Sequence, residues 1–169
     1  MESFLTEYSK AFEERDLCRT YIYTDDEKEK IFGFFSLGIR CLKLPVDTPL
    51  SKTTRKKMNV NPENRVIQSY LLGQLCRSDC SDPGFGQYMM GDAFNILIST
   101  KQKIGCRMVR VDCSPALKNY YESNGFIHVG TKNNLHQLVT YIWWIHVKTN
   151  TGAWMISGSS FFNYENVIW

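Results

Sequence analysis

The feature that most constrains this sequence is a glycine turn joining an apolar run to an amphipathic segment. Residues 66–76 are apolar at alternate and intervening positions, as in a central strand covered on both faces. One stripe of residues 87–103 is apolar and the other is polar, which is typical of a surface helix. Gly84 and Gly86 lie between the two segments. Strand, tight turn and helix in this order indicate a mixed α/β sheet.

The rest of the 169-residue chain alternates helical and extended patterns. We expect a helix to about Arg15 opened by Ser3, a hairpin of residues 20–24 and 31–44, and a short helix after Ser51. Further along we expect a strand at 108–113, a helix from Pro115 ended by Gly125, and strands at 126–129 and 138–147. The predicted fold class is α/β, a central twisted mixed sheet with helices on both faces, formed by residues 1–147.

The composition and the spacing of its residues argue against a secreted, a membrane-spanning or a metal-binding protein. The acidic N-terminus does not have the cationic start of a signal peptide, and no apolar run approaches the ~20 residues of a membrane span. We therefore expect no membrane partner. The six cysteines form no CxxC pair and the three histidines show no HxxxH spacing, so we expect no metal and favour a reducing cytoplasm. A net charge of +3 is too small to indicate nucleic-acid binding by itself.

The glycine turn has a chemistry of its own. Gly84 and Gly86 allow a tight turn whose N–H groups point outward at the positive end of a helix dipole. Such a turn is a site for phosphate groups. Glycines before helices are common, however, so this turn by itself is weak evidence for a phosphate site. A second motif further along the chain strengthens the prediction.

That second motif is residues 120–126, Tyr-Tyr-Glu-Ser-Asn-Gly-Phe, one helix and one strand after the glycine turn. It resembles the F/L-Y-E-x-x-G-F signature of the GNAT superfamily of N-acetyltransferases. That superfamily places its acetyl-CoA pyrophosphate loop and its catalytic tyrosine in the same order. The resemblance covers residues 31–145 and is strongest from Ser69 to Phe126.

The resemblance implies a GNAT acetyltransferase that transfers an acetyl group from acetyl-CoA to a primary amine. In such folds the strand before the loop splays from its neighbour, and its backbone pairs with the pantetheine arm. Tyr121 would be the acid that protonates the leaving thiolate, since a phenol with a pKa near ~10 is protonated at neutral pH. The residues expected to contact the cofactor are Leu75, Cys76, Arg77, Gly84, Phe85, Gly86, Gln87, Tyr88, Ser114 and Lys118.

Several positions depart from the family pattern. Ser81 stands where the loop usually has glutamine or arginine, which leaves two alternatives: cofactor binding is weaker than usual in the family, or Arg77, Gln87 or Lys118 compensates. Ser114 replaces the common asparagine seven residues before the tyrosine. No glutamate occurs in residues 66–77 to act as a base, which leaves deprotonation through ordered water as the simpler hypothesis.

The sequence leaves other interpretations open. Tyr121 could be only a core aromatic, in a GNAT-fold protein of little activity that binds CoA or a protein partner through the same cleft. The aromatic extension 148–169 could cover the sheet, form an edge strand or pack on the second subunit of a homodimer. Small GNAT toxins acetylate aminoacyl-tRNA and pair with an antitoxin. A tRNA acceptor would need cations such as Lys52, Arg55, Lys56 and Lys57 together with Arg77.

Overall fold

The computed structural model describes residues 3–142, and it divides them into two compact units. Unit 1 consists of the residues up to Gly38 together with Gly73–Asn95. Unit 2 consists of Ile39–Leu72 and the described residues from Ile96 onward. The extension 148–169 and the end of the strand expected at 138–147 lie outside the described residues.

Unit 1 begins with a helical segment and a hairpin. A π-helical turn, Phe4–Tyr8, runs into α1 (Ser9–Glu14), so the expected helix is present. Ser3 was predicted to cap it, but this is wrong, because Ser3 itself has helical dihedral angles and its side chain makes no cap hydrogen bond. The predicted hairpin is confirmed as β1 (Cys18–Thr24) antiparallel to β2 (Ile31–Ile39).

The core of unit 1 lies between this hairpin, β5 (Tyr70–Arg77) and the first part of α3 (Phe85–Lys103). Gly33 on β2 marks the closest approach: a Cβ there would lie 2.7 Å from the Met89 sulfur and 2.8 Å from the Cys76 carbonyl oxygen. A side chain at this position would therefore force α3 or β5 to move. The side chains that form this core are Phe34, Phe35, Leu37, Cys76, Met89, Met90, Ala93 and Phe94.

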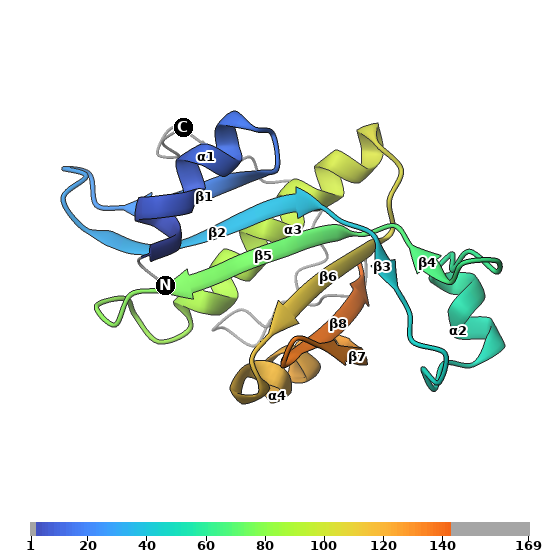
Figure 1. Ribbon diagram of the computed structural model, residues 1–169. Helices are drawn as coiled ribbons and strands as arrows, with labels where there is room; N and C mark the ends of the chain where they lie inside the picture. Colours follow the sequence, from blue (N-terminus) through green and yellow to red (C-terminus); the bar gives the residue numbers. More distant parts are fainter. Residues whose placement is uncertain (1–2, 143–169) are drawn as a thin grey trace. The chain divides into compact units, whose positions relative to one another are not determined.

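Unit 2 contains the other strands of the sheet. β6 (Met108–Cys113) was predicted with these bounds, and it pairs antiparallel with β8 (Leu135–Tyr141). β7 (Ile127–Lys132) pairs antiparallel with β8, and the first residues of β5 pair parallel with β6. The strand order is β1-β2-β5-β6-β8-β7, a six-stranded mixed sheet (Figure 1). The predicted α/β class with a mixed sheet is confirmed.

Two predicted long strands are each interrupted. The segment 31–44 leaves the sheet after β2 and forms β3 (Leu42–Lys43), whereas 66–76 divides into β4 (Val66–Ile67) and β5. Arg40 and Ser69 lie at the two breaks and are bonded to each other, the Arg40 N–H to the Ser69 carbonyl and the Ser69 hydroxyl to the Arg40 carbonyl. β3 and β4 then pair in a separate two-stranded sheet.

This small sheet and α2 (Lys52–Lys57) belong to unit 2. α2 begins as predicted, with the Ser51 hydroxyl accepting the Thr54 N–H at 3.1 Å. Burying Leu42 and Ile67 against Met108 explains why the chain breaks the long strands, because apolar burial is the main favourable term in folding. The full cluster comprises Leu42, Leu44, Met58, Ile67, Met108, Val129, Val139 and Tyr141.

The helix predicted from Pro115 is present as a 3₁₀ turn, Pro115–Leu117, followed by α4 (Lys118–Ser123). Gly125 has φ +83°, so the predicted left-handed cap is confirmed. The Thr140 hydroxyl donates to the Gly125 carbonyl at 2.9 Å and ties the end of α4 to β8. No helix among residues 3–142 is long and apolar enough to cross a membrane.

Candidate functional site

The glycine turn begins α3 two residues earlier than predicted, at Phe85. Gly84 has φ +92°, a conformation that favours glycine, and its carbonyl accepts the N–H groups of Gln87 and Tyr88 at 2.9 and 3.1 Å. The Phe85 N–H donates to the Asp82 carbonyl at 3.1 Å. Within residues 3–142, the N–H groups of Gly84 and Gly86 make no such bond. Two donors at a helix start are thus available to an anion.

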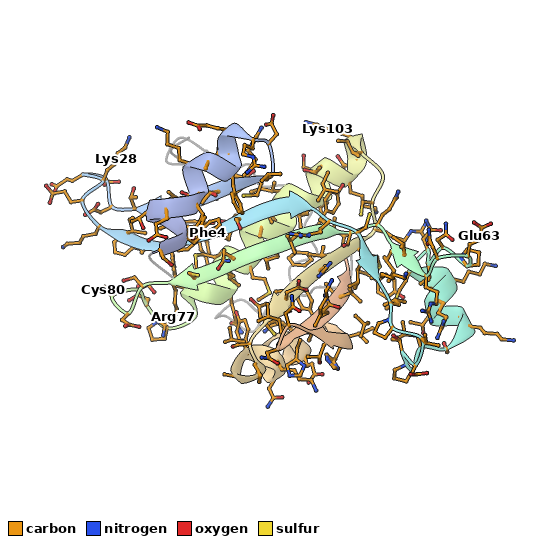
Figure 2. All side chains as sticks on the ribbon, in the orientation of Figure 1. Phe4, Lys28, Glu63, Arg77, Cys80 and Lys103 are labelled. Carbon is orange, nitrogen blue, oxygen red and sulfur yellow. The ribbon has the colours of Figure 1, made fainter. Side chains whose placement is uncertain are left out.

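Arg77 and Ser81 organise the loop before Gly84. The Ser81 hydroxyl donates to the Ser78 carbonyl at 2.6 Å, so its side chain closes the loop. The Arg77 Nη1 atom lies 3.4 Å from the carbonyl oxygens of Ser78 and Ser81. Arg77, Gln87 and Lys118 are the three residues expected to compensate for Ser81. Of these, Arg77 has the side chain that contacts the carbonyl oxygens of this loop (Figure 2 labels Arg77 and Cys80).

Leu75, Cys76 and Arg77 form the last part of β5, which belongs to unit 1. The pairing of β5 with β6 covers Tyr70–Leu72, in unit 2. The Cys76 side chain is buried, and burial raises the pKa of its thiol. A buried, protonated thiol is a packing residue, so Cys76 is suited to bind a ligand through its backbone and not through its side chain.

Tyr121 lies in unit 2, on α4, with 4% of its surface exposed. Its ring packs edge-on against Tyr120 and Phe126, with centroids 5.3 and 5.4 Å away. Its carbonyl accepts the N–H groups of Asn124 and Phe126 in the turn that ends the helix. The signature segment therefore holds this tyrosine rigidly, by packing on both sides and by backbone hydrogen bonds.

The remaining predicted contacts lie at the start of the same helix. Ser114 is exposed, and its carbonyl accepts the Leu117 N–H in the 3₁₀ turn. The Lys118 ammonium lies 3.7 Å from the Glu122 carboxylate. Both side chains of this ion pair are partly exposed, so the pair contributes little to stability and Lys118 is able to bind another anion in its place.

Sequence reasoning missed an acid–phenol pair beside the glycine turn. The Tyr23 hydroxyl donates to the Asp92 carboxylate at 2.7 Å, and desolvation raises the pKa of Asp92. The ring of Tyr23 packs against Phe85 and Tyr88, the first and fourth residues of α3. Sixty-nine residues separate Tyr23 from Asp92, so no local spacing could have indicated the pair.

Charge is divided unequally between the two units. Residues 1–38 and 73–95 carry twelve Asp and Glu against six Lys and Arg, a formal charge of −6. Residues 39–72 and 96–145 carry thirteen Lys and Arg against four acids, a formal charge of +9. The net +3 of the whole chain conceals this division, which appears only once the units are known.

The predicted basic run on α2 contains one structural arginine. Arg55 donates from Nε to the Leu50 carbonyl at 3.2 Å and from Nη2 to the Thr48 carbonyl at 3.0 Å, so it fixes the preceding loop. The other three cations of this run, Lys52, Lys56 and Lys57, are exposed. Residues 3–142 contain no group of three His, Cys, Asp or Glu that could hold a metal ion.

No protein-family model and no curated protein matches the sequence, but solved structures match the fold. A bacterial toxin superposes with a TM-score of 0.66 at 17% identity, covering 83% of this chain and 76% of the toxin. A tyrosine-to-phenylalanine variant of KacT has the same TM-score at 20% identity, covering 83% and 80%. The chain has the GNAT fold. Within the GNAT fold, AtaT complexed with acetyl-methionyl-tRNAfMet superposes at 0.64 and 23% identity, covering 80% and 78%.

Proposed function

We propose that this chain is an N-acetyltransferase that uses acetyl-CoA as donor. The observation that carries the proposal is the glycine turn: on a GNAT fold, the N–H groups of Gly84 and Gly86 at the start of α3 have no backbone partner in the described part of the chain, and Arg77 lies on the same loop. Two N–H donors, a helix dipole and a cation suit a pyrophosphate. AtaT, which shares the fold, has been solved bound with AcCoA in its complex AtaTR.

The chemistry assigns separate tasks to the two motifs. When a neutral amine attacks the thioester, a C–N bond forms, the C–S bond breaks, and the sulfur leaves as a thiolate. Backbone N–H groups of Leu75–Arg77 would stabilise the oxyanion of the tetrahedral intermediate. Tyr121 would give its phenolic proton to the thiolate, and the amine would lose a proton to solvent. The packing of Tyr121 fits this task, since a positioned acid needs a fixed ring.

For the acceptor we propose the amino group of an aminoacyl-tRNA. The charge of +9 on unit 2 supports it, because a polyanion is attracted to a surface rich in lysine and arginine. AtaT has been solved with acetyl-methionyl-tRNAfMet and with the antitoxin AtaR, so an antitoxin is a second partner to expect. Under this proposal the protein acts as a toxin.

One alternative has an observation in its favour. The Ser81 side chain closes the loop, and Tyr121 is almost fully buried. Both observations are compatible with a GNAT-fold protein that binds CoA or a partner without turnover. Release of free thiol from acetyl-CoA separates the two functions. The assay should include Met-tRNA, a peptide amine, a polyamine and an aminoglycoside. We expect thiol release with charged tRNA. Acetyl-CoA binding without release for any amine would instead establish the inactive alternative.

A further inference from the structure

A cavity of about 360 Å³ lies in unit 2 where α3 ends. Its lining includes Lys101 from the last turn of α3, Cys106 and Arg107 from the segment leading into β6, Asn59 after α2, and Gln68 before β5. Small-molecule sites in proteins span roughly 300–1,000 Å³, so this cavity lies at the small end of that range. The cavity is built entirely from residues 58–107 of unit 2, and neither the glycine turn nor Tyr121 takes part in it.

Three backbone carbonyls at or next to the cavity lining accept hydrogen bonds from side chains. The Ile104 carbonyl accepts the Tyr70 hydroxyl at 2.8 Å, and the Gln68 carbonyl accepts the Cys106 thiol at 3.5 Å. The Lys57 carbonyl accepts Arg107 Nη1 at 3.2 Å.

The charged groups around the cavity are cations. Lys101 and Arg107 line it, and the described lining includes no carboxylate. Lys56 and Lys57 precede the lining residue Met58 in the chain, and Lys103 follows Lys101; all three are exposed. Figure 2 labels Lys103 at the end of α3. The cavity therefore joins one guanidinium, one ammonium and two amide side chains, within the unit that carries +9.

We propose that this cavity is a phosphate site, and that its ligand is a phosphate of the RNA backbone. A lysine is a point charge for phosphate, and an arginine offers a planar set of donors to two phosphate oxygens. Within residues 3–142, Arg107 donates from Nη1 to the Lys57 carbonyl, and its other guanidinium nitrogens make no hydrogen bond. The choice of RNA rests on the proposed function, whereas the phosphate chemistry is shared with free nucleotides.

Binding of a fluorescein-labelled single-stranded RNA, measured by anisotropy without acetyl-CoA, tests the site. Lys101→Gln and Arg107→Gln should each weaken binding about tenfold at low salt and reduce the slope of log K against log salt by about 1. The matched controls are Lys43→Gln and Lys132→Gln, exposed cations of the same unit outside the cavity, which should change affinity less than twofold. Lys101→Arg, which keeps the charge, should retain binding.

Three results would overturn the inference. Equal losses in the cavity and control variants would mean that the unit attracts RNA through its net charge, without a site. Unchanged binding in Lys101→Gln and Arg107→Gln would exclude the cavity. ATP binding more tightly than the RNA, and with the same sensitivity to these variants, would assign the site to a free nucleotide. None of these binding measurements requires acetyl transfer. Each result can therefore be interpreted even if the protein proves to have no acetyltransferase activity.

Discussion

At the scale of single residues, Tyr121 and Tyr120 form a matched pair of phenols on α4. Tyr121→Phe removes only the hydroxyl, so kcat should fall by roughly 10²-fold to 10⁴-fold, the range for loss of a positioned acid, while acetyl-CoA affinity stays nearly constant. Tyr120→Phe is the control, because its ring contacts Tyr121 and should keep packing. Equal turnover by wild-type protein and Tyr121→Phe would make Tyr121 a packing residue.

Asp92 supplies a prediction about pH. Desolvation raises the pKa of its carboxyl above the ordinary 3.8, although the Tyr23 hydroxyl bond opposes the shift. From about pH 4 up to the raised pKa, the folded protein holds a proton that the unfolded chain has lost. The free energy of unfolding should therefore decrease as pH rises through this interval.

Asp92→Asn should remove that decrease, because the amide oxygen can still accept the Tyr23 hydroxyl and does not ionise. Urea unfolding of both proteins between pH 4 and pH 7 measures the difference. The stability of the variant relative to wild type should increase with pH. Parallel curves would show that Asp92 has the same pKa in the folded and unfolded states.

At the scale of elements, the glycine turn leads directly into α3. Gly86 lacks the positive φ of Gly84, so a side chain at Gly86 tests close ligand approach without backbone strain. Gly86→Val should fold and should bind acetyl-CoA much more weakly by calorimetry. Undiminished affinity in the folded variant would exclude this turn as the pyrophosphate site.

The packing of α3 on the sheet depends on Gly33. Gly33→Ala should lower the free energy of unfolding by about 1–3 kcal/mol, because its methyl group would meet the Cys76 carbonyl oxygen and the Met89 sulfur. Gly105→Ala is the control, since a Cβ there has no neighbour within 4 Å. Denaturant unfolding compares them. Equal stability of the two variants would show that α3 can shift without cost.

At the scale of the whole molecule, the division of charge governs the proposed acceptor. Acetylation of charged tRNA should fall steeply with added salt, whereas acetylation of a small amine should respond little. Reversing Lys56 and Lys57 to Glu should weaken the tRNA reaction further. Arg55 is unsuitable for this test because it holds the carbonyls of Thr48 and Leu50. A salt-independent tRNA reaction would contradict a role for the basic unit.

Local sequence signals determined most of the elements and both motifs. The bounds of β6 follow from the alternation of its residues. The Ser51 cap of α2 follows from a hydroxyl residue before a helix, and the left-handed Gly125 follows from a glycine after one. These features depend on residues within a few positions of each other, so a short stretch of the sequence is enough to predict each of them. The glycine turn and the 120–126 segment are local in the same sense.

Tertiary structure alone decided what depends on residues far apart. The Arg40 and Ser69 bonds break two strands that the sequence pattern made continuous, because burying Leu42 and Ile67 in unit 2 outweighs longer ladders. Asp92 meets Tyr23 only in the folded chain. The charges of −6 and +9 require the assignment of residues to units. Such long-range pairings follow from which segments pack together, and no window of the sequence contains both partners.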